Sequence, residues 1–558
     1  MPTWMRDYRK AGPLATLVLV MAVLLVTSPQ VTSHGGADAS GQQQPDSLTP
    51  SAQPSADATA TARPTSSAAP VAHPSGPPSV APPPGSTSFV PRGTVAPPPG
   101  SGKGSGGGGA TYQGVADKTI TMGFTWQHQA CGNYTDSAVA AGFGVPQPDP
   151  QSSITSAIAY FERFPARAFP NLAPALAKGV SAKSGYWGRR IKPLFEDNGG
   201  PLCADKARAT ATQLAEQDKA FGTVQIPNDG TNQFMAEVMA AHHLLDIGAS
   251  GLTRSDYTKS APYIYDVTFS GTDAVEAWGS YSCRDLVGKK STATGDLKTA
   301  GLKRVFGLVH QDTPLGNALA AQAKQAIGRC HGAFAVDVAY PTDISQQGPA
   351  ASNAIAQFVA QHVTTVYMLT DPLFSATLTT AASGGSYKPE WSVSSVGFND
   401  IAFVVEHFYD TGQQANVSGA SFLSSSTATT WDRSDSYKAW KAVNPNTEPP
   451  GDWNNWFLQI EVLYAGLLGA GPDLTPSSFA GGLHSVCGPC YRKNLKDVGL
   501  GFGPGDPTGV DDFTLVKFNT SKQDVHDPGD GTGRPAYGDW DFPEGGLRYH
   551  RTITQPER

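Results

Sequence analysis

Cys487 and Cys490 enclose Gly488 and Pro489, and this order of residues is that of a dithiol redox site. Such a site needs a preceding strand, a following helix and an electropositive helix N-terminus that lowers the pKa of the first thiol. Here GGLHSV precedes the motif, a Gly- and Pro-rich stretch soon follows it, and too few residues remain for the rest of a redox domain. The sequence therefore favours a structural disulfide that holds a loop.

The other reactive side chains lack the spacing of a catalytic or metal site. His242 and His243 are adjacent, so on a helix they point about 100° apart and cannot bind one metal as an i, i+4 pair does. The sequence contains no HExxH, no His/Cys cluster at zinc spacing, no P-loop and no Gly-x-Ser-x-Gly turn. Asp511 and Asp512 are typical of a solvated turn, with a calcium loop as the alternative. We expect no catalytic residue, no metal and no cofactor, and therefore not an enzyme.

Composition limits the class of protein and its partners. The chain has 558 residues, of which 39% are hydrophobic and 16% charged, which is enough for more than one compact domain. The formal net charge is -7 and no strongly basic block occurs, so we expect no nucleic-acid partner.

The N-terminus has the pattern of a secretory signal over residues 1–33. Arg6, Arg9 and Lys10 precede an apolar run at 14–26, and small residues follow at 31–33. The run is short for a membrane span, which needs about 20 residues, although an uncleaved signal anchor stays open. No cysteine follows the run closely enough for a lipid anchor. We predict a secreted or extracytoplasmic protein that contacts the membrane only through this segment, if it is uncleaved.

Six cysteines and export together permit disulfides. Six cysteines allow 15 pairings, and the sequence alone does not select one. Proximity along the chain favours Cys131 with Cys203, Cys283 with Cys330, and Cys487 with Cys490.

Two segments have the composition of unfolded chain. Residues 34–110 are rich in Pro, Ser, Ala and Gly and repeat APPPGS at 81–86 and 96–101, so they predict a disordered linker, which either acts as a stalk or has no role. Residues 521–558 are rich in Asp, Gly and Pro and predict an extended C-terminal tail. The globular part is expected at 111–520.

Within the globular part, short apolar strands alternate with amphipathic helices. The first series of predicted strands is 118–124, 191–195, 221–226, 244–247 and 263–269, with helices at 203–217, 233–243 and about 273–287. The second series has strands at 304–309, 334–340, 364–369 and 391–396, with helices at 315–327, 346–361 and 373–382. This alternation predicts an α/β protein with two doubly wound parallel-sheet lobes joined by a hinge. We place lobe 1 at about 118–290 plus part of the C-terminal region, and lobe 2 at about 300–450.

Four segments resemble a known family. They are TITMGF at 119–124, RRIKPLFEDNGG at 189–200, FGTVQIPNDG at 221–230, and VAYPTDISQQGPAASNAIAQFVAQHVTTVYMLTDP at 338–372. Over about 118–518 the chain resembles type I periplasmic binding proteins, in particular the leucine/isoleucine/valine-binding receptors of ABC importers. The resemblance implies a fold whose two lobes close around a small polar ligand, such as an amino acid or amide, and an ABC permease as partner.

The resemblance also places ligand-binding residues at the carboxyl ends of the strands, in the cleft between the lobes. Carried over by position, the candidates are Trp126, Gln127, Asn228, Asp229, Ser250, Thr253, Thr370, Asp371, Phe398 and Asn399.

The chain departs from that family at two places. Residues 129–183 are longer and richer in Pro than the family's loop and helix. Where an amino-acid receptor needs an acid for the ammonium group, this chain has Gly397-Phe398-Asn399, with Asp400 adjacent. Trp126, Trp391 and Phe398 suit an aromatic, amide or less polar ligand, or else belong to the core. A ligand-sensing ectodomain without a transporter, an exported enzyme and a cell-wall structural protein are the alternative functions.

Overall fold

The structure is a computed structural model of the chain. It describes residues 109–126, 150–170, 179–199, 203–226, 232–292, 294–295, 300–426, 430–450, 452–486, 498–524 and 537–553. The predicted signal segment and linker lie outside these residues, apart from the last two positions of the linker. Within the described residues, no helix has the length and apolar character that a membrane span requires.

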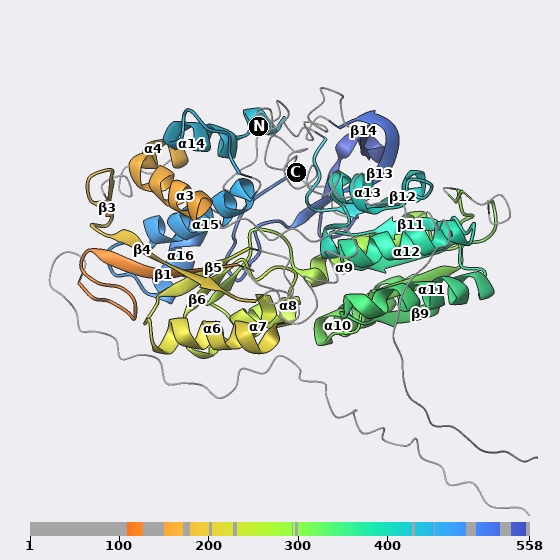
Figure 1. Ribbon diagram of the computed structural model, residues 1–558, viewed down its shortest axis with the longest axis horizontal. Helices are drawn as coiled ribbons and strands as arrows, with labels where there is room; N and C mark the ends of the chain where they lie inside the picture. The colour runs from red at the N-terminus through yellow and green to blue at the C-terminus, as the bar shows by residue number, and fades with distance from the viewer. Residues whose placement is uncertain are drawn as a thin grey trace, which may run out of the picture. The chain divides into compact units, whose positions relative to one another are not determined.

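The first sheet contains five parallel strands in the order β4-β1-β5-β6-β7. Helices α6 and α7 cover one face, and α3, α15 and α16 cover the other (Figure 1). The strands are β1 (Thr119–Trp126), β4 (Arg190–Asp197), β5 (Gly222–Gln225), β6 (Leu245–Ile247) and β7 (Ile264–Tyr265). The helices are α3 (Gln151–Arg163), α6 (Ala204–Glu216), α7 (Asn232–Ala241), α15 (Trp453–Ala470) and α16 (Pro476–Val486).

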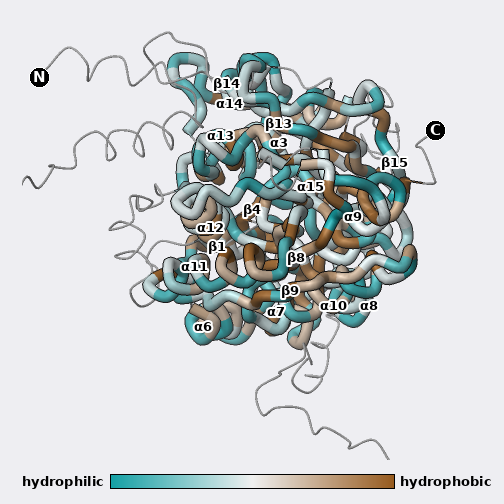
Figure 2. Tube along the Cα trace, turned by 90° about the vertical axis from the view of Figure 1, so that its right-hand side faces the viewer, coloured by the Kyte–Doolittle hydropathy of each residue, from teal (hydrophilic) through white to brown (hydrophobic). Residues whose placement is uncertain are grey.

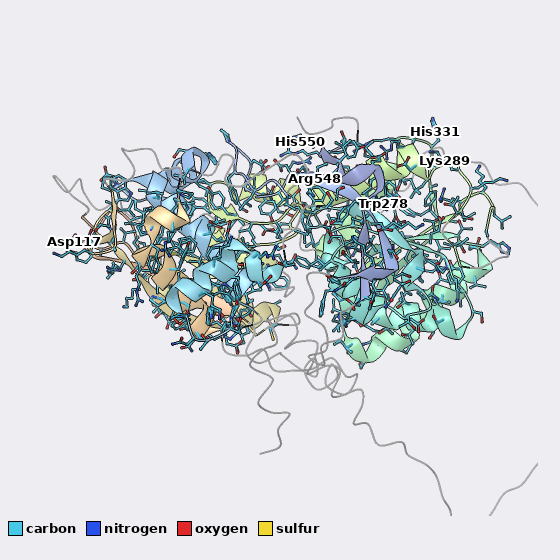
Figure 3. The ribbon with its side chains drawn as sticks, turned by 90° about the horizontal axis from the view of Figure 1, so that it is seen from above. Asp117, Trp278, Lys289, His331, Arg548 and His550 are labelled. Carbon is cyan, nitrogen blue, oxygen red and sulfur yellow. A yellow bond between two sulfur atoms is a disulfide. The ribbon has the colours of Figure 1, made fainter. Side chains whose placement is uncertain are left out.

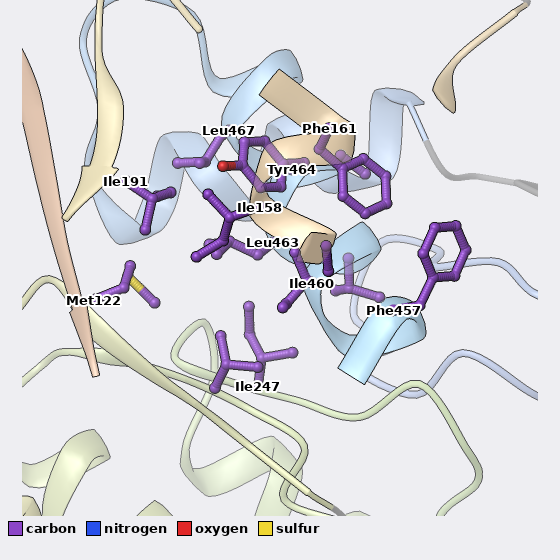
Figure 4. Packing of buried hydrophobic residues seen from close by; sticks show 14 of the residues in the cluster. Met122, Ile158, Phe161, Ile191, Ile247, Phe457, Ile460, Leu463, Tyr464 and Leu467 are labelled. Carbon is purple, nitrogen blue, oxygen red and sulfur yellow. The ribbon is translucent and has the colours of Figure 1, made fainter. Parts of the chain in front are cut away.

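The core of this lobe forms where α15 crosses the sheet. Tyr464 of α15 stacks on Phe161 of α3, with ring centroids 5.2 Å apart. Met122, Ile191 and Ile247 extend from three strands toward the same helices (Figure 4). The first lobe therefore combines an N-terminal sheet with two helices that begin at Trp453 and Pro476, far along the chain from its last strand at Ile264–Tyr265.

The second sheet has eight strands in the order β14-β13-β12-β11-β10-β8-β9, with β15 also paired to β13. Strands β8 to β12 are parallel, and β13 to β15 are antiparallel additions. The strands are β8 (Phe306–Gln311), β9 (Phe334–Tyr340), β10 (Thr365–Leu369), β11 (Glu390–Val393), β12 (Val417–Ser421), β13 (Asp512–Gln523), β14 (Tyr537–Asp541) and β15 (Arg548–His550). The helices that pack with them include α10 (Pro314–Gly328), α11 (Ile344–Ala360), α12 (Pro372–Gly384) and α13 (Ala402–Phe408). The predicted alternation of strands and helices in both series is thus confirmed. Figure 2 shows hydrophilic residues along α6.

Helix α9 (Gly271–Asp285) packs against the second sheet, although the sequence prediction placed it in lobe 1. Trp278 is fully buried, stacks on Tyr367 of β10 at a centroid distance of 3.5 Å, and donates from Nε1 to Ser392 Oγ at 2.9 Å. The boundary of lobe 2 therefore lies before α9 rather than near residue 290.

The predicted strand at 263–269 ends early, because residues 266–268 leave the sheet to pair with another segment. Asp266 N–H donates to Pro507 O, and Gly509 N–H donates back to Asp266 O. Val510 N–H donates to Thr268 O at 2.8 Å. Two chain segments that connect the elements of the two sheets therefore run side by side, as the predicted hinge requires.

The extended tail predicted at 521–558 is corrected by the structure over its described residues. Strands β14 and β15 pair with β13, and Trp540 and Tyr549 are buried. Arg548, labelled in Figure 3, is fully buried and donates from Nε to Asp512 Oδ2 at 2.9 Å. Asp512 is likewise not the solvated turn residue that was predicted. The abundance of Asp, Gly and Pro conceals these strands because only a few well-placed apolar residues anchor them.

The predicted disulfide between Cys283 and Cys330 is confirmed and links α9 to the end of α10. Cys203 is also disulfide-bonded, and none of the described cysteines is free. Cys131, Cys487 and Cys490 lie outside the described residues, so their pairings stay predictions.

Candidate functional site

The carboxyl end of β1 carries two buried polar groups without hydrogen-bond partners. Trp126, a predicted ligand-binding residue, is 7% exposed, and its Nε1 has no partner among the described residues. Thr125 is fully buried and its Oγ1 also lacks one within the same part of the chain. Buried polar atoms are nearly always paired in native proteins, so two such atoms at one strand end need an explanation.

The neighbouring strand and helix add two more such atoms. Gln225 at the end of β5 donates from Nε2 to Asp246 at 2.8 Å, and Asn232 of α7 donates from Nδ2 to Gly248 O at 2.8 Å. Both side chains are buried, and in the described structure Gln225 Oε1 and Asn232 Oδ1 accept no hydrogen bond. Residues 125 and 225 are paired in the β1–β5 register and so face the same side of the sheet. Buried polar atoms without hydrogen-bond partners in the described structure therefore gather near the carboxyl ends of β1 and β5, as expected of a binding site that closes around a solute.

Ser250 and Thr253, predicted after β6, have structural partners. Ser250 Oγ lies 3.2 Å from Thr268 Oγ1 in the segment that leaves the first sheet. Thr253 is the N-cap of α8 (Arg254–Lys259) and forms a capping box with Asp256. The hydroxyl of Thr253 thus stabilises its own helix. Contact of either residue with a ligand stays a prediction.

In the second sheet, polar side chains from three strand ends meet at Asp371. Tyr340 O–H at the end of β9 donates to Asp371 Oδ2 at 2.6 Å, and Gln311 Nε2 at the end of β8 donates to the same oxygen at 3.1 Å. Asp371 also caps α12 by accepting from Phe374 N–H. Burial and the nearby Asp371 raise the pKa of Tyr340 well above its usual value, so its phenol stays protonated as a donor. Gln311 and Tyr340 were not among the predicted residues, although each ends a recognised strand.

Phe398 and Asn399 differ in their surroundings. Phe398 is partly exposed and has φ +60°, a left-handed conformation, and its ring lies 6.5 Å from Phe269. Asn399 is fully buried, donates to Thr370 O and accepts from Tyr409 O–H at 3.0 Å. Its amide therefore joins the turn that follows β11 to the residue that follows β10. Trp391 is a core residue that donates to Gln413 Oε1 at 3.0 Å.

Asp400, which follows β11, is fully buried and is not exposed at the carboxyl ends of the strands. It accepts from Ser395 and Ser421 at 2.6 Å each, and burial raises its pKa despite these hydrogen bonds. Gln127, Asn228 and Asp229 lie outside the described residues, so their contact with a ligand stays a prediction.

A cavity of about 320 Å³ lies at the amino ends of the parallel strands of the second sheet, beside Arg304, Thr365 and Glu390. Glu390 there accepts from Arg304 Nε at 2.7 Å and Thr365 Oγ1 at 2.6 Å, so these polar groups already satisfy one another. Within the described residues, no group of His, Cys, Asp and Glu has the arrangement of a metal site.

Comparison with known proteins identifies the class. The model of the periplasmic binding protein family matches residues 126–503, and the chain belongs to that family. Its members are solute-binding proteins, and membership implies an extracytoplasmic location. The matched residues include β4 to β12 and helices α15 and α16, but only Trp126 of β1, and the match ends before β13.

Solved structures share the fold at low sequence identity. One is a solute-binding protein of an ABC transporter from Rhodopseudomonas palustris, in complex with 3,4-dihydroxybenzoic acid. It is 12% identical to this chain, with a TM-score of 0.50, and the match covers 78% of this chain and 98% of that protein. A periplasmic binding protein from Burkholderia mallei is 13% identical to this chain, with a TM-score of 0.50. The match covers 79% of this chain and 98% of the Burkholderia mallei protein. No curated protein matches the chain. The chain therefore has the type I periplasmic-binding-protein fold and binds a solute.

Proposed function

We propose that the chain captures a small polar solute, such as an amino acid or amide, between its two lobes and delivers it to an ABC importer. The observation that carries the proposal is the set of four buried, unpartnered polar atoms on Thr125, Trp126, Gln225 and Asn232. A bound solute would supply their missing hydrogen bonds. The ABC importer is supported by the Rhodopseudomonas palustris protein, which serves an ABC transporter.

The proposal extends to the class of protein and its location. We infer a binding protein without catalytic activity, held at the membrane through the N-terminal segment wherever that segment is uncleaved. The Pro-rich linker at 34–110 also suits a ligand-sensing ectodomain that works without a transporter, and this is the second candidate function. Binding alone does not separate the two candidates, whereas co-purification with a permease favours the first.

Replacing Thr125 with valine tests the site because the two residues have nearly the same shape. Since Thr125 Oγ1 has no partner among the described residues, removing it should leave the free energy of unfolding unchanged or slightly higher. Solute binding, by contrast, should lose a hydrogen bond of about 0.5–1.5 kcal/mol, which is a loss of affinity of about two- to tenfold. Urea unfolding and calorimetric titration with the best ligand of a solute screen measure the two effects.

Thr223→Val is the matched control on the same face of the neighbouring strand. Thr223 is fully buried, and its Oγ1 donates to Asp246 Oδ1 at 2.8 Å. The same substitution there removes a satisfied hydrogen bond to a buried carboxylate and should lower the free energy of unfolding by about 1–3 kcal/mol. If Thr125→Val destabilises the protein as much as Thr223→Val and leaves binding unchanged, the proposed site is wrong.

A further inference from the structure

Although Lys206 pairs with Asp197 at the end of β4, most segments around the carboxyl ends of the strands contain no lysine or arginine. In the first lobe this is true of residues 119–162, 220–253 and 260–283, and in the second of 305–323, 330–387 and 389–432.

Arg254 in α8 is engaged by Asp273 and Glu276. Arg551, which also approaches Asp273, is engaged by Asp506 and Asp511. Within the described residues, these cations at the strand ends are thus already paired with acids and are not free for a solute's carboxylate or phosphate.

The same edges do carry acids. In the second lobe Asp312, Asp343 and Asp371 follow three adjacent strands. Side-chain hydrogen bonds from Ser345 and Gln346 lower the pKa of Asp343 and keep it ionised. In the described structure Asp371 accepts hydrogen bonds from Gln311, Tyr340 and a backbone amide, which are all neutral donors. This edge is therefore negative near neutral pH and attracts a cation.

A second observation independent of the acids indicates a ligand that donates hydrogen bonds. The amide groups of Gln225 and Asn232 are oriented by their donation to Asp246 and to Gly248 O. Their oxygens, Gln225 Oε1 and Asn232 Oδ1, are buried acceptors without partners in the described part of the chain. An acceptor is satisfied only by a donor, so the solute must present N–H or O–H groups here.

Five helix N-termini at these edges are poor anion sites, whereas α6 and α13 have no side-chain cap. Helices α8, α9, α10, α11 and α12 begin there, and in each a first-turn amide already donates to the side chain of the capping residue. Two of the caps are aspartates, which offset the positive end of the helix dipole. The capping residues are Thr253, Ser270, Thr313, Asp343 and Asp371.

We infer that the solute of this protein carries net positive charge, as an organic amine or guanidine does, and that Asp371 is one of its counter-charges. This inference rests on the proposed function and narrows its class of solute. The N–H groups of such a cation meet the unpartnered acceptors of the first lobe, and its charge meets the acids of the second. The indole N–H of Trp126 is a donor, so its acceptor must come from water or from another part of the solute.

The test is a calorimetric titration of the full chain with solutes sorted by charge. Putrescine, agmatine and spermidine serve as cations, and leucine and glutamine as zwitterions. Acetamide and urea serve as neutral solutes, and benzoate and glutamate as anions. The tightest binder is expected among the cations, at least tenfold tighter than any other class, with an affinity that falls as salt is added. A zwitterion, neutral solute or anion as the tightest binder overturns the inference and leaves solute binding intact. No binding in any class overturns the proposed function itself, and the inference with it.

A charge-neutralising variant gives the second measurement. Asp371→Asn keeps an oxygen that caps α12 but places an amide NH2 where Oδ2 accepted from Tyr340 and Gln311, so the thermal midpoint should fall modestly while cation affinity falls tenfold or more. Asp117→Asn makes the same change of charge on an exposed residue before β1, at the opposite end of that strand (Figure 3), and should alter affinity less than twofold. Equal affinity of the Asp371→Asn protein and the unmodified protein for the cation overturns the inference.

Discussion

Replacing Arg548 with methionine should destabilise the protein by about 3–5 kcal/mol, the usual loss when one partner of a buried ion pair is removed. The Arg548 side chain is 0% exposed and its partner Asp512 is 3% exposed. Arg548 also donates to the carbonyl oxygens of Phe422 and Ser424, so it joins the end of β12 to β13 and β15. The variant leaves the Asp512 carboxylate buried without its counter-charge. Urea unfolding followed by circular dichroism measures the loss.

The double variant Arg548→Met/Asp512→Leu is the control for that interpretation. Because it removes both charges, it should recover part of the stability lost in the single variant. A loss below about 0.5 kcal/mol for Arg548→Met, the size expected for an exposed position, would mean that the C-terminal segment is an extended tail after all.

Trp278→Ala should lower the free energy of unfolding by about 3–5 kcal/mol through loss of a large buried side chain and the cavity that it leaves. The indole stacks between Tyr367 and Phe334, with centroid distances of 3.5 and 5.8 Å. It also donates to Ser392, whose oxygen would be left without this donor. Differential scanning calorimetry of the variant at matched pH measures the effect.

Trp278→Phe separates the ring packing from the hydrogen bond, since phenylalanine keeps an aromatic ring and lacks the N–H. Its loss should be clearly smaller than that of the alanine variant. Equal and small losses in both variants would contradict the packing of α9 on the second sheet.

The strands and helices of both lobes could be predicted because parallel strands buried on both faces are short apolar runs separated by amphipathic helices. The strand predicted at 334–340 coincides with β9. Strands β14 and β15 could not be predicted, because each is short and polar and exists through pairing with β13. Helix α9 was recognised as a helix, but its lobe depends on the contact between Trp278 and Tyr367, which local sequence does not encode.

The site was predicted less completely, for a related reason. Trp126 and Asp371 could be predicted because each stands at the end of a strand that the sequence reveals. The role of a polar side chain could not be predicted, because it depends on hydrogen-bond partners that lie far away in the sequence. Asn399 follows a predicted strand, yet its amide donates to the carbonyl oxygen of Thr370 and so has a structural partner. Thr253 with Asp256 three residues later has the pattern of a capping box, and that signal indicates a structural role from sequence alone.

The central claim is that a solute binds at the carboxyl ends of the strands of both sheets. Hydrogen–deuterium exchange of the full chain, with and without the tightest ligand of the solute screen, tests it most directly. The account predicts slower exchange with ligand in two separate regions, around residues 222–253 in the first lobe and 366–400 in the second. Protection confined to one lobe, or to the amino ends of the strands around Arg304 and Glu390, would contradict it.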